Sequence, residues 1–592
     1  MADIKNGYIG IDLGTTNSCI ATSYYTSNGA VQTDMLEFSQ RCASNEIKMD
    51  RILPSYIYVQ QDGRFLIGIG AKEEDEKMRS MSGAQESRAM RVFKRDMGKD
   101  NVEYKIGAQT FTPVSASKMI LEECGKVYNQ YRRNRDRIKF SDTPTTITCP
   151  ACFEKDARED TQRAAKEAGF DLDNVRMLAE PNAALLYYIY RETSRGFLNL
   201  SQKKRFVTVD LGGGTCDVVI IDVHEETLPD GKRNLVFRPI GTPNRGDLGG
   251  ADFDKLVARA FLIWFLKENR IQIDNESTEF RRLVNLLFSW AEKVKINLSR
   301  SFEYAVQNHP EHDLTEEEFF NETVTSLDPY TIHIDNLYQG HSFDYEITLA
   351  EYLEITERLI YKTVEHYETV EQALASKNLE EIIEETRKRC NCEKEDIDYV
   401  FFTGGMSLFL PLHYHLFKLL GKRVETPDDP LTAVAQGAAL YTLYKEAELI
   451  NKELPRITNE EYHQATVAER AIRNNDQEVR MPTAIGKTYM IEKKDRLPFV
   501  LIEKNKEYPL PRTRIESPFK TTTERGAIIN IFLGESQFDS KLQRVRSASL
   551  TFPEPKPIGT PFTIEYEIND SGSPVFYIIF GENEEYKIGG VE

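Results

Sequence analysis

The chain has 592 residues and a mass of 68.0 kDa, which is too large for one hydrophobic core, so we expect two to four domains. Apolar residues make up 40% of it, its formal net charge is −19, and it contains no run of the roughly 18 apolar residues that a membrane span needs. Because nucleic acids and anionic membranes are bound through basic surfaces, these values argue against both as main partners.

The N-terminal residues lead directly into a strand-like pattern at Tyr8 and show no apolar signal-peptide region, so we expect a cytoplasmic protein. The eight cysteines are scattered, which is typical of a reducing compartment. Cys149 and Cys152 form a C-x-x-C pattern. No second cysteine pair has the spacing of a zinc site, so we interpret both as ordinary core or loop thiols.

The first predicted elements, within residues 7–30, are a strand, a glycine-rich turn and a second strand, and Asp12 ends the first strand. The same pattern returns at residues 206–221, where Asp210 precedes a turn with three consecutive glycines. An internal repeat of this kind predicts two equivalent units that face each other across a cleft.

Helical patterns lie between the two copies, at residues 154–169 and 179–193. Further along the chain, the apolar run 399–403 ends in a third glycine-rich turn at Gly404 and Gly405. Strands that alternate with helices in this way predict an α/β fold.

The character of the sequence changes twice in its C-terminal third. After about residue 447 it becomes charged, and from about residue 481 it consists of short alternating strands with hairpin turns. We therefore expect an α/β part over residues 1–445, a charged linker over 446–480 and an all-β domain over 481–592.

The repeated turns predict a phosphate site, because backbone N–H groups of a glycine-rich turn can approach phosphate oxygens closely. Two such turns that face each other would hold a polyphosphate from both sides. Asp12 and Asp210, at the strand ends, would then hold magnesium through water. A single turn of this type is equally typical of a structural hairpin, but its repetition favours the nucleotide site.

These motifs resemble those of the seventy-kilodalton heat-shock chaperones. Residues 12–18 and 210–217 are similar to the two phosphate motifs of that family, and residues 404–407 are similar to its adenosine motif. The order is collinear over 1–445 and looser over 481–585. The resemblance implies an actin-like, ribonuclease-H-like ATPase fold of two lobes and four subdomains, followed by an all-β sandwich. It also implies hydrolysis of ATP to ADP and phosphate with Mg²⁺, with K⁺ as a candidate second ion.

The resemblance carries catalytic roles to five residues. Lys94 falls on the family's catalytic lysine, Glu180 and Asp210 on acids that position the attacking water, Asp12 and Asp210 on the acids that hold magnesium, and Thr215 on a hydroxyl at the phosphates. Without it, Lys94 would be interpreted as a solvated surface lysine. The implied nucleotide-binding positions are Gly14, Thr15, Thr16, Asn17, Gly212, Gly213, Gly214, Thr215, Gly249, Gly250, Glu292, Lys295, Ser299, Gly404, Gly405 and Met406.

Some positions depart from the family pattern or stay open. Leu408 stands where many members have an arginine that stacks on adenine, and Leu431 replaces an acidic residue. Arg158 matches a position that relays the nucleotide state between domains in the family, although a surface arginine is an equal alternative. Residues 301–345 and 377–395 look like insertions, which we expect to be solvated loops rather than partner surfaces.

The family's apolar interdomain linker has no obvious counterpart in residues 446–480, so we expect weak coupling or coupling through other contacts. The chain stops soon after the β domain, so we also expect no helical lid over it.

The function implied is that of an ATP-dependent chaperone, which binds extended or unfolded polypeptide, with a J-domain co-chaperone and a nucleotide-exchange factor as candidate partners. Two alternatives stay open. One is a nucleotide-sensing scaffold with a single dedicated partner, and the other is a small-molecule kinase of the same fold.

Overall fold

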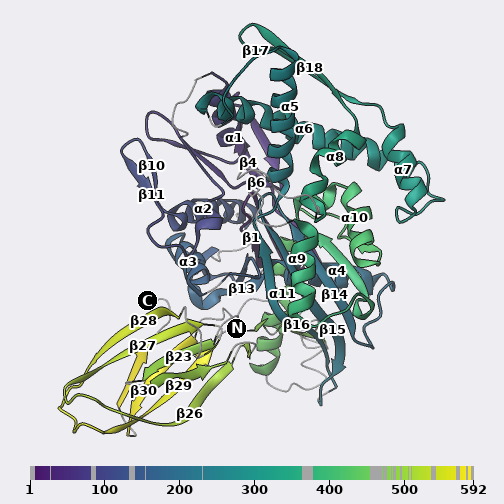
Figure 1. Cartoon of the computed structure of the whole chain (residues 1–592). Coiled ribbons are helices and arrows are strands. Elements are labelled where there is room, and N and C mark those ends of the chain that lie inside the picture. The colour runs from purple at the N-terminus through teal and green to yellow at the C-terminus, as the bar shows by residue number, and fades with distance from the viewer. Residues whose placement is uncertain are drawn as a thin grey trace.

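The computed structural model identifies two central sheets with the same strand order (Figure 1). In each sheet, an antiparallel hairpin is extended on one side by two strands parallel to its first strand and on the other side by an antiparallel strand. The predicted repeat and the α/β class are therefore confirmed. The structure describes residues 7–26, 29–81, 88–132, 140–153, 155–229, 231–275, 277–362, 378–453, 470, 477–481, 483–484, 488–493, 496–503, 506–508, 510–534, 536, 542–568, 574–581 and 584–588.

The two predicted acidic residues lie at equivalent places in the two sheets. Asp12 is the last residue of the first hairpin strand in one sheet, and Asp210 is the penultimate residue of the first hairpin strand in the other. The first sheet has the order β13 (Val175–Ala179), β12 (Thr145–Cys149), β1 (Tyr8–Asp12), β2 (Asn17–Tyr25), β3 (Val31–Met35), with β6 (Leu53–Pro54) paired to β2. The second has the order β20 (Val424–Glu425), β19 (Tyr399–Thr403), β14 (Lys204–Leu211), β15 (Cys216–Thr227), β16 (Arg233–Gly246), β21 (Gln477–Arg480).

Helices α4 (Glu180–Ser194) and α11 (Ala433–Glu453) pack together, and their apolar side chains share one buried cluster with strands of the second sheet. The approach of α11 to β1 is close: a Cβ atom at Gly10 would overlap the backbone of Ala439. Glycine at this position is what lets the helix lie directly on the strand. Helix α11 also continues beyond residue 445, where the α/β part was expected to end.

The remaining elements of the α/β part surround these sheets. The region 301–345 is not the solvated loop expected from sequence, because it forms the end of one helix, a second helix and a hairpin, with Phe302, Phe320 and Phe343 in the core. Residues 379–389 likewise form a helix with a buried apolar face.

The other helices of the α/β part are α1 (Ile69–Met81), α2 (Pro113–Arg132), α3 (Lys155–Glu167), α5 (Gly250–Glu268), α6 (Thr278–Gln307), α7 (Glu317–Ser326), α8 (Leu349–Ile360), α9 (Leu379–Arg389) and α10 (Pro411–Leu420). The shorter elements include β4 (Phe38–Arg41), β5 (Ile47–Asp50), β7 (Tyr56–Val59), β8 (Phe65–Ile67), β9 (Ala89–Arg91), the 3₁₀ helix η1 (Phe93–Asp96), β10 (Tyr104–Ile106), β11 (Gln109–Phe111), β17 (Tyr330–Tyr338), β18 (His341–Ile347) and the 3₁₀ helix η6 (Gly405–Leu408).

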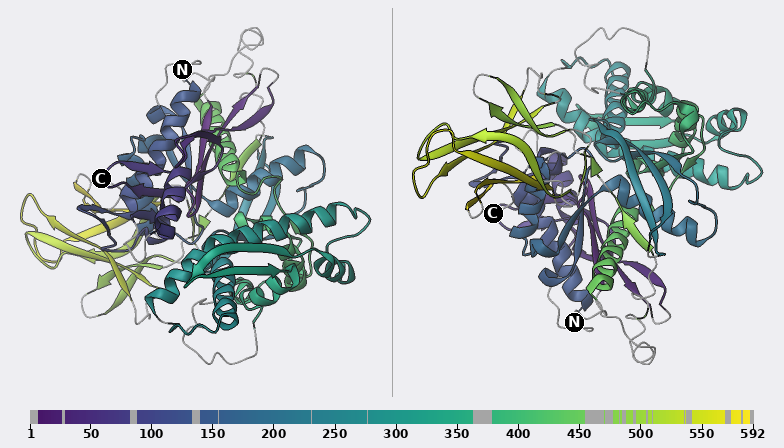
Figure 2. Two further views of the ribbon diagram at one scale, coloured as in Figure 1. Left: turned by 90° about the horizontal axis from the view of Figure 1, so that it is seen from above. Right: turned by 90° about the horizontal axis from the view of Figure 1, so that it is seen from below.

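The C-terminal part consists of strands alone among the residues described there, and it forms a separate group in Figures 1 and 2. Two four-stranded antiparallel sheets contribute apolar side chains to one buried cluster. The first sheet has the order β24 (Arg496–Ile502), β23 (Thr488–Lys493), β27 (Gly526–Gly534), β28 (Gln543–Thr551), the second β26 (Leu510–Lys520), β29 (Pro561–Ile568), β30 (Pro574–Phe580), β31 (Glu584–Ile588), and β22 (Thr483–Ala484) pairs with β25 (Glu507–Tyr508).

The segment between the two parts is not entirely a charged linker. Most of residues 454–476 lie outside the described residues, but β21 adds a parallel strand to the edge of the second sheet, with Val479 opposite Leu235 of β16. Val479 and Met481 are buried in the same cluster as α4 and α11. Two apolar side chains at the end of this charged segment therefore pack on the α/β part. Within the described part of the chain, no helix has the length and apolarity of a membrane span.

Candidate functional site

The two glycine-rich turns meet, because a Cβ atom at Gly213 would overlap the hydroxyl of Thr16 in the opposite turn. Each turn is tied to its surroundings. In the first, Ser55 donates to the carbonyl of Gly14 at 2.8 Å, and in the second, the N–H of Gly212 donates to the carbonyl of Thr215 at 2.9 Å. The structure therefore brings the two predicted phosphate motifs together. Thr15 and Asn17 are half-buried in or beside the first turn, and the side chain of Thr215 is buried in the second.

The start of α5 lies against the second turn, as the resemblance implied for Gly249 and Gly250. The N–H of Gly250 donates to the carbonyl of Gly212 at 3.0 Å, and a Cβ atom at Gly249 would overlap the backbone of Gly214. This places the positive end of a 19-residue helix beside the turn. Helix N-termini favour anions, so the arrangement suits phosphate.

Lys94 is only 2% exposed, so the solvated-lysine interpretation is wrong. Its ammonium group forms an ion pair with the carboxylate of Glu180, the first residue of α4. Burial lowers the pKa of Lys94, but the nearby charges of Glu180 and Asp12 outweigh burial, and the pKa lies above the ordinary lysine value. Lys94 is therefore a positive charge that is held away from water.

Several carboxyl groups surround this lysine. Burial, followed by the charge of Glu180, raises the pKa of Asp12 to about 7, although Thr148 donates a hydrogen bond to Asp12 at 3.1 Å. Burial and the same glutamate raise the pKa of Asp210 well above its ordinary value. The carboxyl groups here outnumber the positively charged groups beside them, so the site can accept a cation. Because carboxylate oxygens are ligands that Mg²⁺ prefers, these residues fit a magnesium ion.

Among the residues that the structure describes, no three acidic, histidine or cysteine side chains are grouped as direct ligands of one ion. Magnesium bound through water at Asp12 and Asp210 thus stays a prediction.

Two residues of the site were missed by sequence reasoning. Asp217, opposite Arg245 on the neighbouring strand, is 2% exposed, and burial raises its pKa to about 6. Its place seven residues after Asp210, in the same motif, was the signal that could have found it. The guanidinium of Arg95 lies where a Cβ atom at Gly214 would be, and its buried Nε has no partner among the described residues. Nothing but its position next to Lys94 marked it in the sequence.

The residues predicted for the adenosine have different partners in the structure. Lys295 forms an ion pair with Asp254 at 2.8 Å and lies near Gly250 and Met406. Ser299 instead donates its hydroxyl to the carbonyl of Leu408 at 2.8 Å.

Glu292, also predicted for the adenosine, reaches out of this group. Its carboxylate pairs with Lys72 of α1 at 3.3 Å, so the pair connects α6 to a helix on the other side of the site. Both side chains are more than a third exposed, which keeps the energy of this pair small.

We expect Lys72→Ala to release bound nucleotide about two- to fivefold faster, because the pair has to open if α1 and α6 separate during release. Stopped-flow release of a fluorescent ADP analogue measures this. Lys126→Ala, which removes an exposed pair inside the single helix α2, is the control and should leave the rate unchanged. An unchanged rate in Lys72→Ala would show that the pair does not hold nucleotide in place.

The third glycine turn lies against Asp210, because Gly404 has φ +84° and a Cβ atom there would meet the carboxylate of Asp210 at 2.5 Å. Leu408 is 50% exposed, and the side chain of Leu431 would be 3.9 Å from a Cβ atom at Gly405. The predicted adenine region is therefore flanked by leucines.

Leu408→Arg should tighten ATP binding about two- to fivefold, because a guanidinium can stack on adenine whereas leucine offers only apolar contact. Calorimetry with ATP measures the gain, and Leu408→Gln, polar but uncharged, is the control. No gain in the arginine variant would mean that the adenine is held elsewhere.

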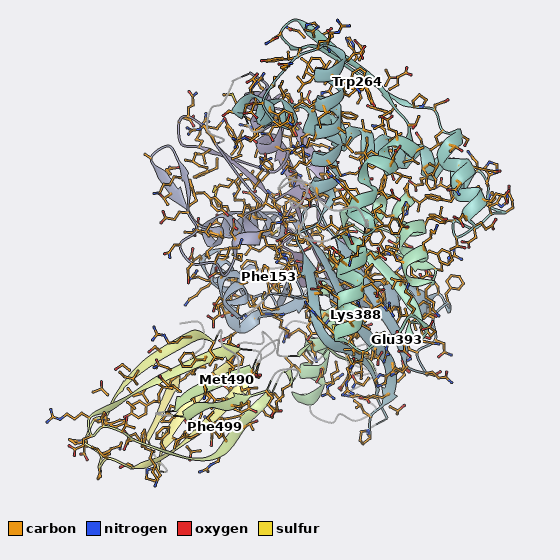
Figure 3. The ribbon with its side chains drawn as sticks, viewed as in Figure 1. Phe153, Trp264, Lys388, Glu393, Met490 and Phe499 are labelled. Carbon is orange, nitrogen blue, oxygen red and sulfur yellow. The ribbon has the colours of Figure 1, made fainter. Side chains whose placement is uncertain are left out.

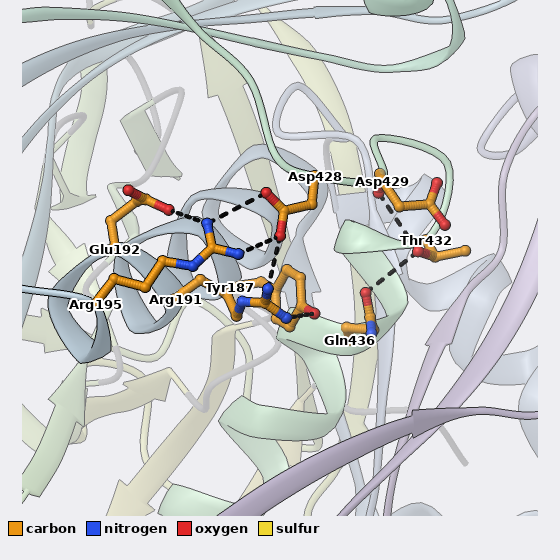
Figure 4. Close-up of polar contacts among 8 residues, drawn as sticks. All are labelled: Tyr187, Arg191, Glu192, Arg195, Asp428, Asp429, Thr432 and Gln436. Carbon is orange, nitrogen blue, oxygen red and sulfur yellow. Dashed lines mark hydrogen bonds and ion pairs between the residues drawn. The ribbon is translucent and has the colours of Figure 1, made fainter. Parts of the chain in front are cut away.

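A polar network holds the loop that carries Leu431 (Figure 4). Arg191 and Arg195, near the end of α4, both pair with Asp428, at 2.7 and 2.8 Å. At the other end of the loop, the hydroxyl of Thr432 lies 3.2 Å from Gln436 on α11. The loop is thus anchored to the two helices that pack between the sheets.

The remaining sequence-based interpretations concern residues next to the lysine. Arg158 is buried and donates to the carbonyl of Phe153 at 3.1 Å, so it is not a surface arginine. Burial raises the pKa of the Cys149 and Cys152 thiols, which agrees with their interpretation as ordinary thiols.

The C-terminal strands carry apolar side chains on both faces of one sheet. Tyr489 and Ile491 of β23 face the shared core, whereas Met490 between them faces the other side of the sheet and is nevertheless fully buried. The strand register places Val500 and Phe532 on either side of Met490. Figure 3 labels Met490 and, on β24, Phe499, which packs towards the core. A short apolar row thus crosses the outer face of this sheet.

Comparison with known proteins supports the resemblance. A family model described as "Hsp70 protein" matches residues 8–452. The "Chaperone protein DnaK" of Halobacterium salinarum is 27% identical over 567 residues, covering 95% of this chain and 71% of the relative. The protein of the same name from Thermosipho melanesiensis is 26% identical over 576 residues, covering 97% of this chain and 78% of the relative. The chain is therefore a divergent member of the Hsp70 family.

Proposed function

We propose that this protein binds ATP with Mg²⁺, hydrolyses it to ADP and phosphate, and uses that cycle to control the binding of extended polypeptide to its C-terminal strands. The observation that carries the proposal is the meeting of the two glycine turns next to the buried Lys94–Glu180 pair. Backbone N–H groups on two sides suit a polyphosphate, and a buried cation suits the charge that develops during phosphoryl transfer.

Each side chain has a role in this proposal. Lys94 stabilises charge on the γ-phosphoryl group, and Glu180, which accepts from Lys94, orients the attacking water. Asp12 and Asp210 would hold Mg²⁺ through water, and the bound ion would neutralise charge on the phosphate oxygens. The Arg95 guanidinium, with its orphaned Nε, adds a second donor at the same turn.

The all-β part is proposed to be a sandwich that grips a strand-like segment. Support comes from the core shared by its two sheets and from the buried position of Met490 on the outer face of one of them. Apolar pockets on the face of a sheet suit alternate side chains of an extended peptide.

A J-domain co-chaperone and a nucleotide-exchange factor are the partners we propose for the cycle, as the family relationship suggests. The nucleotide state is proposed to reach the peptide surface through β21. That strand pairs with β16 in the α/β part and directly precedes the C-terminal strands. A segment that pairs with a sheet in one state and leaves it in another would couple the two sites.

The test is steady-state hydrolysis of Mg–ATP with and without added ligands. We expect a slow basal rate that apolar peptides raise and sugars leave unchanged. Stimulation by a sugar alone, with phosphate transferred to it, would indicate the small-molecule kinase. No response to any peptide, together with nucleotide-dependent capture of one protein, would favour the dedicated scaffold.

A further inference from the structure

The turn that follows Gly404 is held by backbone hydrogen bonds and by side chains. The N–H of Ser407 donates to the carbonyl of Gly404, and the N–H of Phe409 donates to the carbonyl of Met406, both at 3.0 Å. The residue before Gly404, Thr403, is secured by the sheet, because it pairs with Asp210 in the parallel register of β19 and β14. Beyond Gly404 the chain leaves the sheet as a short 3₁₀ turn, η6, and then enters α10 at Pro411. Side chains of the turn itself and of neighbouring elements add further bonds to this turn.

Three side chains supply those bonds. The hydroxyl of Ser407 donates to the carbonyl of Gly404 at 2.7 Å. Ser299 of α6 donates to the carbonyl of Leu408 and accepts from the N–H of Leu410 at 3.4 Å. His413, two residues into α10, reaches back so that its Nε2 lies 2.8 Å from the carbonyl oxygen of Ser407.

The chemistry of the His413 contact is well defined. A carbonyl oxygen can only accept, so Nε2 carries the hydrogen and donates it. The imidazole is 8% exposed and packs edge-to-face on Phe402, with ring centroids 5.4 Å apart. Burial lowers its pKa, which keeps the ring neutral. The carbonyl that it reaches belongs to Ser407, which is itself only 4% exposed and would be left poorly solvated without this donor.

We propose that His413 is a positioning residue for the nucleoside end of the ATP site, acting through the Ser407 carbonyl to hold the turn that carries Gly405, Met406 and Leu408. The proposal rests on the ATP-binding function proposed above. His413 reaches the proposed nucleotide-binding turn through this hydrogen bond.

The consequence is a change in affinity more than in chemistry. Without the bond, the turn samples other shapes, and apparent affinity falls in proportion to the fraction of molecules that keep the binding shape. Losing a buried hydrogen bond of this kind corresponds to about a five- to thirtyfold weaker Kd for ATP. Because Thr403 and Asp210 are held by the sheet, KM should change much more than kcat.

The experiment compares two histidines of the same helix. His413→Phe keeps a ring of similar shape but removes the donor. His415→Phe is the matched control, since the hydrogen bond of His415 lies between its Nδ1 and the hydroxyl of Tyr361, at 2.8 Å, and among the described residues it makes none to the turn. His413→Gln tests rescue, because its amide N–H can replace the lost donor. Calorimetry with ATP, single-turnover hydrolysis and thermal melts are recorded for the full chain and each variant.

We expect His413→Phe to weaken ATP binding by the factor given above, His413→Gln to recover most of the affinity, and His415→Phe to bind as the unaltered chain does. Equal affinities for the two phenylalanine variants would overturn the role of His413 while leaving ATP binding intact. If His413→Phe does not fold, a weak-binding but well-folded His413→Gln would equally contradict the proposal. Failure of the unaltered chain to bind ATP would instead remove the proposed function, and this inference with it.

Discussion

Lys94→Ala should slow single-turnover ATP hydrolysis by about a hundred- to a thousandfold, the range found when one preorganised donor to a transition state is removed. The buried ammonium of Lys94 is the cation nearest to Glu180, the proposed water-orienting residue. ATP affinity should change far less, because the turns around Gly14 and Gly213 bind phosphate through the backbone.

The control for this variant is Lys99→Ala, which removes an exposed lysine near the end of the same short segment, paired with Asp96 at 2.8 Å. Thermal melts are needed as well, because Lys94→Ala leaves the carboxylate of Glu180 buried without its partner. An unchanged hydrolysis rate in a folded Lys94→Ala protein would exclude Lys94 from the mechanism.

Val479→Asp should abolish the stimulation of hydrolysis by an apolar peptide. Val479 is 1% exposed and lies opposite Leu235, so an aspartate there would bury a carboxylate without a partner. That burial costs on the order of several kcal/mol, more than a strand of four residues is expected to offset, so β21 should leave the sheet. Nucleotide binding should persist, because the turns and Lys94 do not touch this strand.

Glu478→Ala is the matched control on the same strand. It removes a partly buried ion pair with Lys232 at 3.1 Å, which is worth about 1 kcal/mol or less, and peptide stimulation should survive. Steady-state hydrolysis with and without saturating peptide reports on both variants. Full stimulation in Val479→Asp would show that β21 does not carry the coupling.

The central sheets could be predicted because their signal is local. A strand, a glycine turn and a second strand need only a few consecutive residues. The second copy of this pattern, at 206–221, is what predicted two equivalent sheets. The structure gives both copies the same strand order. The third turn could be placed for the same reason, since its apolar run ends directly in glycine.

What sequence reasoning could not give depends on contacts between distant segments. Lys94 reads as a surface lysine until η1 is packed against α4, some 86 positions along the chain. Ser299 and Glu292 share a helix with Lys295. In the structure, however, Ser299 donates to the carbonyl of Leu408, whereas Glu292 pairs with Lys72. Helical spacing shows which side chains are neighbours on one helix but not what faces them.

The pairing of residues 477–480 with β16 could not be predicted for a related reason. In a stretch dominated by charged residues, one buried valine, Val479, gives no periodic signal, and this segment becomes a strand by pairing with the edge of β16. The region 301–345 shows the same limit, because its acidic run hides the spaced aromatic residues that enter the core.

The central claim, that ATP controls polypeptide binding, is tested most directly by stopped-flow release of a fluorescent apolar peptide from the full chain, mixed with ATP or with ADP. Val500→Glu places a charge at a half-buried position opposite Met490, so it should remove binding at the outer face of the sheet and identifies the signal that comes from the apolar row. We expect faster release with ATP than with ADP, and no bound peptide in the Val500 variant. Equal release rates with both nucleotides, from a chain that binds both, would contradict it.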